Sequence, residues 1–293
     1  MKLGLQLNSF DWNGGPERFG ATLAEIARAA EEAGFDRIGV ADHVWQHPIM
    51  GGPEANEPEC YTTLAFLAAN TSRIGLIPMV TGVHFRYPGV LAKTATTLDV
   101  LSCGRTWLGI GAGHYEEEAR GLGILFPPLG ERFEMLEEAV QICLRMWSGE
   151  RGDERTFEGR HYRLERPLNL PQSLTRPHPP IMIAGSGEKK TLLLVARYAQ
   201  ACNVRPSPEI PRKLDVLRRH CEAEDRDYNS IEKTSPFAFD VGEDGSKTDE
   251  LIGQLRWLAG MGIQTVMGVV PNVDRITPLE IIGREVIPAV ADL

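Results

Sequence analysis

An acid, an imidazole and an indole follow one another at the end of a short apolar run near the start of the chain. Residues 38–41 form the run, and Asp42, His43 and Trp45 come directly after it. A short apolar segment of this kind is typical of a strand that is covered on both faces. Because parallel strands point their carboxyl ends at an active site, Asp42 and His43 are candidates for acid–base chemistry. The alternative is that Asp42 caps a turn and His43 is an ordinary surface residue.

Nucleophilic and metal chemistry have weaker support. The chain has no Gly-x-Ser-x-Gly motif. His43 and His47 are four residues apart and would share one face of a helix, but Pro48 argues against a helix there. We therefore expect neither a hydrolytic nucleophile nor a metal site.

Two glycine-rich segments could approach a phosphate group. The segment 109–113 resembles a dinucleotide-binding loop, but His114 stands where the third glycine of that motif belongs. The acidic residues 116–118 would also repel a pyrophosphate, so close backbone packing is the alternative for these glycines.

The second segment, 184–187, places backbone amides and the Ser186 hydroxyl before an expected helix, as in a phosphate cradle. Glu188 opposes an anion there, whereas Lys189 and Lys190 could offset it. The sequence leaves open whether this is a phosphate loop or a tight turn.

Apolar strand segments alternate with amphipathic helical segments eight times. The expected strands are 3–7, 38–45, 74–81, 106–111, 180–184, 201–205, 235–241 and 264–270. Regular alternation of this kind predicts a parallel sheet, and eight units predict one domain over residues 1–293, a (β/α)8 TIM barrel. A doubly wound sheet is the alternative. The periodicity fails in 150–180, which we interpret as an insertion with a small hairpin at 155–164.

Composition restricts the class of protein. The chain is 42% hydrophobic and 24% charged, with a net charge of −9, which favours a packed enzyme over a protein that binds nucleic acid or an anionic membrane. We expect no membrane span and no signal peptide, because no apolar run is long enough and the N-terminal segment lacks a cleavage site. Five widely spaced cysteines fit reduced thiols. These features place the protein in the cytoplasm.

Taken in order, several segments resemble the luciferase-like monooxygenase family, in its deazaflavin-dependent oxidoreductase branch. The resemblance spans the chain and is carried by residues 4–7, 30–36, 41–43, 71–76, 91–93, 97–102, 104–105 and 108–113.

The resemblance implies a barrel with a flavin-like ring laid across the carboxyl ends of the strands. By this likeness Asp42 contacts the ring edge, and His43 is the active-site acid or base. The matching cofactor contacts are Met79, Val80 and Thr81, with a cis peptide at Met79–Val80; Ala112, Gly113 and His114 along the cofactor; and Gly185, Ser186 and Gly187 at its phosphate. Sugar-phosphate dehydrogenases of the branch carry a glutamate in place of His114, which puts their substrate and proton-transfer scheme in doubt here.

The implied function is hydride transfer between a deazaflavin coenzyme, coenzyme F-420, and a small organic substrate, with His43 moving a proton. An FMN-dependent monooxygenase on the same scaffold and a non-catalytic flavin-binding protein are the alternatives. Trp45, Tyr61 and Phe85 are the expected substrate walls, with specificity in 44–59 and in the insertion after Gly149. Each aromatic residue could equally belong to the core. Acidic surface and family habit favour a homodimer.

Overall fold

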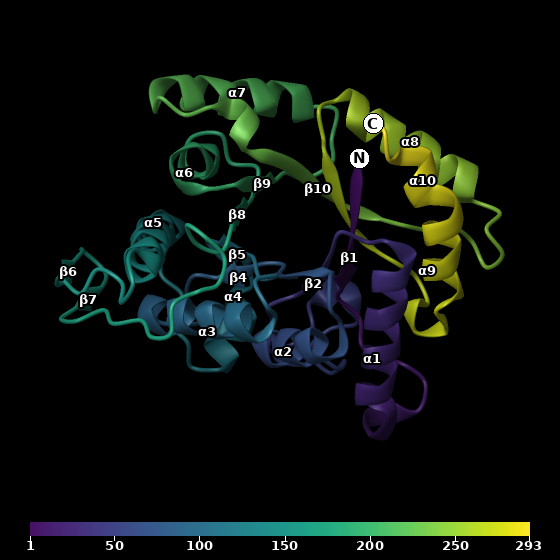
Figure 1. Cartoon of the computed structure of the whole chain (residues 1–293), viewed down its shortest axis with the longest axis horizontal. Coiled ribbons are helices and arrows are strands. Elements are labelled where there is room, and N and C mark those ends of the chain that lie inside the picture. Colours follow the sequence, from purple (N-terminus) through teal and green to yellow (C-terminus); the bar gives the residue numbers. More distant parts are fainter.

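Eight parallel strands form a closed ring in the computed structural model, which describes residues 1–293 (Figure 1). They are β1 (Lys2–Leu7), β2 (Arg37–Val40), β3 (Gly75–Pro78) with its continuation β4 (Thr81–Gly82), β5 (Leu108–Gly111), β8 (Ile181–Ala184), β9 (Ala201–Asn203), β10 (Glu232–Ala238) and β11 (Thr265–Val269). The hydrogen-bonded order is β3-β2-β1-β11-β10-β9-β8-β5-β4, and a parallel bridge between Leu76 and Thr106 closes the ring. The predicted (β/α)8 barrel is confirmed.

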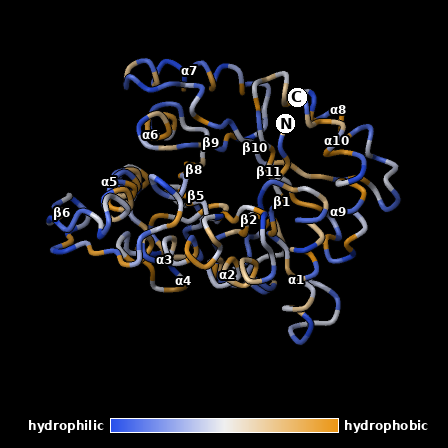
Figure 2. Tube along the Cα trace, in the orientation of Figure 1, coloured by the Kyte–Doolittle hydropathy of each residue, from blue (hydrophilic) through white to orange (hydrophobic).

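Helices surround this ring (Figure 1). They are α1 (Gly15–Ala33), α2 (Cys60–Asn70), α3 (Pro88–Leu101), α4 (Glu116–Gly121), α5 (Leu129–Trp147), α6 (Thr191–Tyr198), α7 (Ile210–Ala223), α8 (Thr248–Gly260), α9 (Thr277–Ile281) and α10 (Ile287–Val290). Figure 2 shows hydrophobic colour on the strands and inner helix turns, and hydrophilic colour on outer turns and loops. A core of 63 buried residues fills the space between strands and helices. None of the helices combines the length and apolar character that a membrane span requires.

The insertion holds the predicted hairpin. Strands β6 (Phe157–Glu158) and β7 (Arg163–Leu164) pair antiparallel. Helix α7 begins at Ile210, because Ser207 accepts from the Glu209 N–H in a turn before the helix. Helix α9 begins at Thr277, and no side chain caps its first turn.

The lower end of the barrel is closed by a buried arginine. Arg37 is 2% exposed; it donates twice to Glu232 across the barrel at 3.0 Å and lies 4.2 Å from the Trp107 ring centroid. Above it, Ile77, Met182, Ala201 and Met267 pack together. The interior is therefore a packed core, and a ligand site must lie at the carboxyl ends of the strands.

Strand β5 passes so close to strand β3 that one position requires glycine. A Cβ atom added at Gly109 would lie 2.1 Å from the Pro78 carbonyl oxygen. The obstacle is backbone, so relief needs a shift of the strands themselves.

We predict that Gly109→Ala lowers the free energy of unfolding by about 3 kcal/mol, the upper range for overpacking. Gly253→Ala is the matched control, since nothing lies within 4 Å of that helical position, and it should gain about 0.5–1 kcal/mol. Urea denaturation measures both. Equal stability of the two variants would contradict the close approach.

Candidate active site

A cavity of about 950 Å³ lies at the carboxyl ends of the barrel strands. Of the residues predicted from sequence, eleven line it: Asp42, His43, Met79, Val80, Phe85, Ala112, Gly113, His114, Gly185, Ser186 and Gly187. The Met79–Val80 peptide is cis, as predicted. The strand ends therefore gather segments that are far apart in the chain.

Three predicted residues lie outside the cavity wall. Thr81 is fully buried, and its hydroxyl bonds the Tyr61 hydroxyl at 2.8 Å. The indole of Trp45 packs against Gly121 of α4, where an added Cβ would meet the ring at 1.9 Å. Thr81 thus lies behind the wall that Met79 and Val80 form. The insertion 150–180 contributes no lining residue.

His43 is held by a carboxylate that comes from another part of the chain. Nδ1 of His43 lies 2.9 Å from Glu118 Oε2. The other oxygen of Glu118 accepts from the backbone N–H groups of Val44 at 2.5 Å and Trp45 at 3.0 Å. Glu118 is fully buried. Burial raises the pKa of this carboxyl, but the bonds from His43, Trp45 and Val44 outweigh burial and hold the pKa below its usual value.

This arrangement fixes how the imidazole can react. An ionised carboxylate only accepts hydrogen bonds, so Nδ1 of His43 donates and Nε2 is left for the cavity. From the sequence, Glu118 was expected only to repel a phosphate. The contact between Glu118 and His43 joins residues 75 positions apart, so no short-range pattern in the sequence indicates it.

The Asp42 carboxylate is also oriented by a partner. Both of its oxygens accept from Arg86, at 2.6 and 3.1 Å. Arg86 donates to Glu59 as well, at 2.5 Å, and lies over the Tyr61 ring. A bidentate pair of this kind fixes both position and plane of the carboxylate. Tyr61 and Arg86 thus support Asp42 from behind.

Three further histidines surround His43 and favour their neutral forms. Burial, with Arg132 next in effect, lowers the pKa of His84 to about 4. Burial and the neighbouring His43 lower the pKa of both His47 and His114. Despite this clustering, no group of three or more His, Cys, Asp or Glu side chains is arranged to hold a metal ion.

The Gly185–Gly187 loop has the donors of an anion site. The amides of Ser186 and Gly187 donate to no protein acceptor. Lys213 donates to the Ser186 carbonyl at 3.1 Å, and the Arg205 N–H donates to the Ser186 hydroxyl at 3.0 Å. Both Arg205 and Lys213 line the cavity.

Glu188, which opposed an anion in the sequence, is paired with Arg212 at 2.7 Å. The positive charges that offset Glu188 at this loop are therefore not those of the exposed Lys189 and Lys190. They belong to Arg205, in the segment after β9, and to Arg212 and Lys213 on α7.

Residues 7–274 match the family model described as luciferase-like monooxygenase. The F-420-dependent glucose-6-phosphate dehydrogenase of Kineococcus radiotolerans is 32% identical over 78% of this chain and 66% of its own length. Its counterpart in Nakamurella multipartita is 38% identical over 54% and 45%. The matched region thus spans about half to two thirds of the length of these relatives.

Solved structures share the fold at low identity. An F-420-dependent secondary alcohol dehydrogenase, solved with an F-420–acetone adduct, superposes with a TM-score of 0.82 at 19% identity and 99% coverage of both chains. The coenzyme F-420-dependent tetrahydromethanopterin reductase of Methanopyrus kandleri superposes with a TM-score of 0.80 at 17% identity and 98% coverage of both.

We predict that Glu118→Gln reverses the tautomer of His43. An amide N–H in place of Oε2 needs an acceptor, so Nδ1 must lose its proton and Nε2 must gain one, while the remaining carbonyl oxygen keeps the bonds from Val44 and Trp45. Nitrogen-15 NMR of the histidine rings reports the tautomer. Glu116→Gln, on the exposed face of α4, is the control. An unchanged His43 spectrum in the Glu118 variant would refute the assignment.

Proposed function

The chain belongs to the luciferase-like monooxygenase family, and we propose that it is an oxidoreductase that transfers a hydride between coenzyme F-420 and a small organic substrate. The observation that carries the proposal is the single cavity that joins His43 to the Gly185–Gly187 loop. Curated relatives named F-420-dependent dehydrogenases add support.

The residues around the cavity fit a long cofactor with a ring at one end and a phosphate at the other. The unpaired amides of Ser186 and Gly187, with Lys213 and Arg205, would hold the phosphate. Met79, Val80, Ala112, Gly113 and His114 form the wall along which the ring would lie, and Asp42 would contact its edge. The bound deazaflavin supplies the carbon that gives or takes the hydride.

The protein's own part is to position the reactants and move a proton. His43 lines the cavity, and its bond to Glu118 through Nδ1 fixes the ring and leaves Nε2 without a protein partner, as a general acid or base requires. His43 is 17% exposed at its side chain, so a bound substrate would exclude water from it. We assign to His43 the proton that leaves or enters the substrate oxygen during hydride transfer.

Purified protein should bind coenzyme F-420 in preference to FMN, measured by fluorescence quenching. His43→Asn should leave that affinity unchanged but slow single-turnover hydride transfer by about 100-fold or more. Lys213→Ala should instead weaken F-420 binding by about tenfold or more, because it removes a charge-assisted contact.

Preference for FMN would favour the monooxygenase alternative. F-420 binding without hydride transfer to any acceptor would favour a binding protein.

We further propose a cytoplasmic homodimer. Five thiols without a disulfide, four of them buried, suit a reducing compartment. The outer face of α2 and α3 carries exposed apolar side chains, with Val90 at 60% and Leu101 at 63% exposure. Between the two helices lies a hollow of about 420 Å³ that includes both residues. A second copy of the chain would cover this apolar face.

Val90→Glu should convert the dimer to a monomer, because it places a charge in the apolar contact. Leu125→Glu is the control, since Leu125 is 84% exposed and lies outside that face. Sedimentation velocity gives the mass of each. A wild-type monomer, or a dimer that tolerates the Val90 change, would exclude this interface.

A further inference from the structure

Positively charged side chains line only one side of the cavity. Arg205 and Lys213 are the only arginine and lysine side chains that line it, and both lie beside the Gly185–Gly187 loop. That loop follows β8, Arg205 follows β9 and Lys213 lies on α7; β8 and β9 are about half-way round the ring from β1 and β2. Glu209 also lines this side, 3.8 Å from Lys213, and offsets part of its charge. The cations therefore lie where the cofactor phosphate is proposed to bind.

The opposite side, next to His43, carries acids and neutral imidazoles. Asp42 and Glu118 line it. Arg86 does not line the cavity, and its guanidinium is committed to Asp42 and Glu59. The pKa values of His47 and His114 are lowered, by burial first. No lysine or arginine side chain lines the cavity there, and the charge of Arg205 acts on His114 only after burial and the neighbouring His43, His47 and Glu118.

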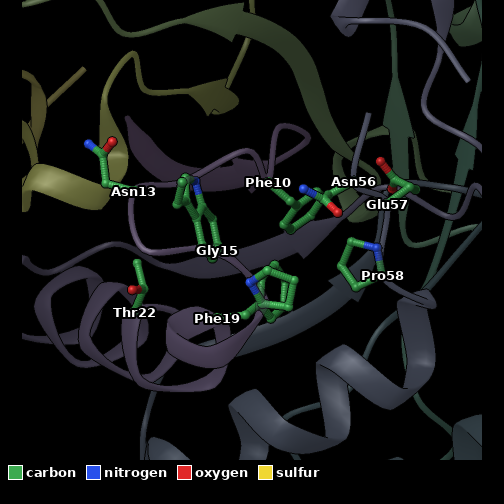
Figure 3. A pocket seen from close by; sticks show the side chains of 10 residues that line it. Phe10, Asn13, Gly15, Phe19, Thr22, Asn56, Glu57 and Pro58 are labelled. Carbon is green, nitrogen blue, oxygen red and sulfur yellow. The ribbon is translucent and has the colours of Figure 1, made fainter. Parts of the chain in front are cut away.

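The carboxyl group of Glu57 is affected by the negative charges on this side. It lies on the rim of a second cavity of about 280 Å³ with Asn56 and Pro58, near Phe10 (Figure 3). One carboxyl oxygen accepts from Gln46 at 2.6 Å, and the other is buried without a partner. Burial, followed by the charges of Glu118 and Asp42, raises the pKa of Glu57 to about 8. Glu57 does not line the cavity beside His43, but the charges of Glu118 and Asp42 that disfavour its ionised form would also disfavour an anionic substrate there.

We infer that the substrate carries no anionic group and is an uncharged alcohol or its carbonyl counterpart. The inference rests on the proposed function for the position of the cofactor. A phosphate ester bound beside His43 would lose water contacts without gaining a cationic partner, which is unfavourable. A hydroxyl or carbonyl group needs only the hydrogen bond that His43 Nε2 can provide.

Glucose 6-phosphate and inorganic phosphate are the probes, titrated by calorimetry into F-420-loaded and cofactor-free protein. Loaded protein should bind neither at millimolar concentration. Cofactor-free protein should bind inorganic phosphate weakly at the Gly185–Gly187 loop, and Lys213→Ala and Arg205→Ala should each remove that binding. Glucose 6-phosphate that binds loaded protein, or binds independently of both cations, would overturn the inference.

Turnover provides a second arm. With F-420 present, an uncharged secondary alcohol such as 2-propanol should reduce the coenzyme faster than glucose 6-phosphate does. The reverse order would overturn the inference. Failure to bind F-420 would defeat the proposed function alone, because the titrations of cofactor-free protein would still detect or exclude an anion site beside His43.

The negative potential itself can be tested through Glu57. The pKa of Glu57 is higher in the folded protein than in the unfolded chain, so its protonation stabilises the folded state. That stabilisation is lost as the pH rises, and the free energy of unfolding of the wild type should therefore fall from about pH 4.5 to about pH 8. Glu57→Gln should lack that part of the fall in urea denaturation, and the exposed Glu54→Gln should retain it. Parallel curves for wild type and Glu57→Gln would contradict the raised pKa of Glu57.

Discussion

The site depends on one buried carboxylate. Glu118, from α4, accepts hydrogen bonds from His43, Val44 and Trp45, so it joins the segment after β2 to the segment after β5. The three bonds compensate the burial of its charge and at the same time fix the imidazole that faces the cavity. Removing them would leave an unpaired buried charge, which is among the more destabilising changes a protein can undergo. The same hydrogen bonds thus position His43 and stabilise this part of the barrel.

The barrel determines where such a corner can exist. Arg37 and Glu232 close the lower end, and the interior above them is packed. Glycines at the points of closest approach, Gly109 above all, let the strands meet. Ligands are therefore confined to the carboxyl ends of the strands. The cavity there is polarised, with cations beside the Gly185–Gly187 loop and carboxylates beside His43. That division suits a phosphorylated cofactor on one side and an uncharged substrate on the other.

Much of this could be predicted from the chain alone. The alternation of apolar strands and amphipathic helices gave the barrel, and the polar ends of those strands gave Asp42, His43 and the Gly185–Gly187 loop. The cis peptide at Met79–Val80 followed from family likeness. The direction of individual side chains was harder to predict. Thr81, Trp45 and Tyr61 were expected in the cavity but support its walls, because one step along a strand or loop turns a side chain to the other face.

The sequence by itself determined the order of strands and hence which residues come to the mouth of the barrel, because hydrophobic periodicity is a local property of the chain. Only the tertiary structure decided the partners of those residues. Glu118 is 75 positions from His43, and Arg86 is 44 positions from Asp42. Contacts over such separations depend on how the strands are staggered and on which faces the loops turn inward, and no short-range pattern encodes either.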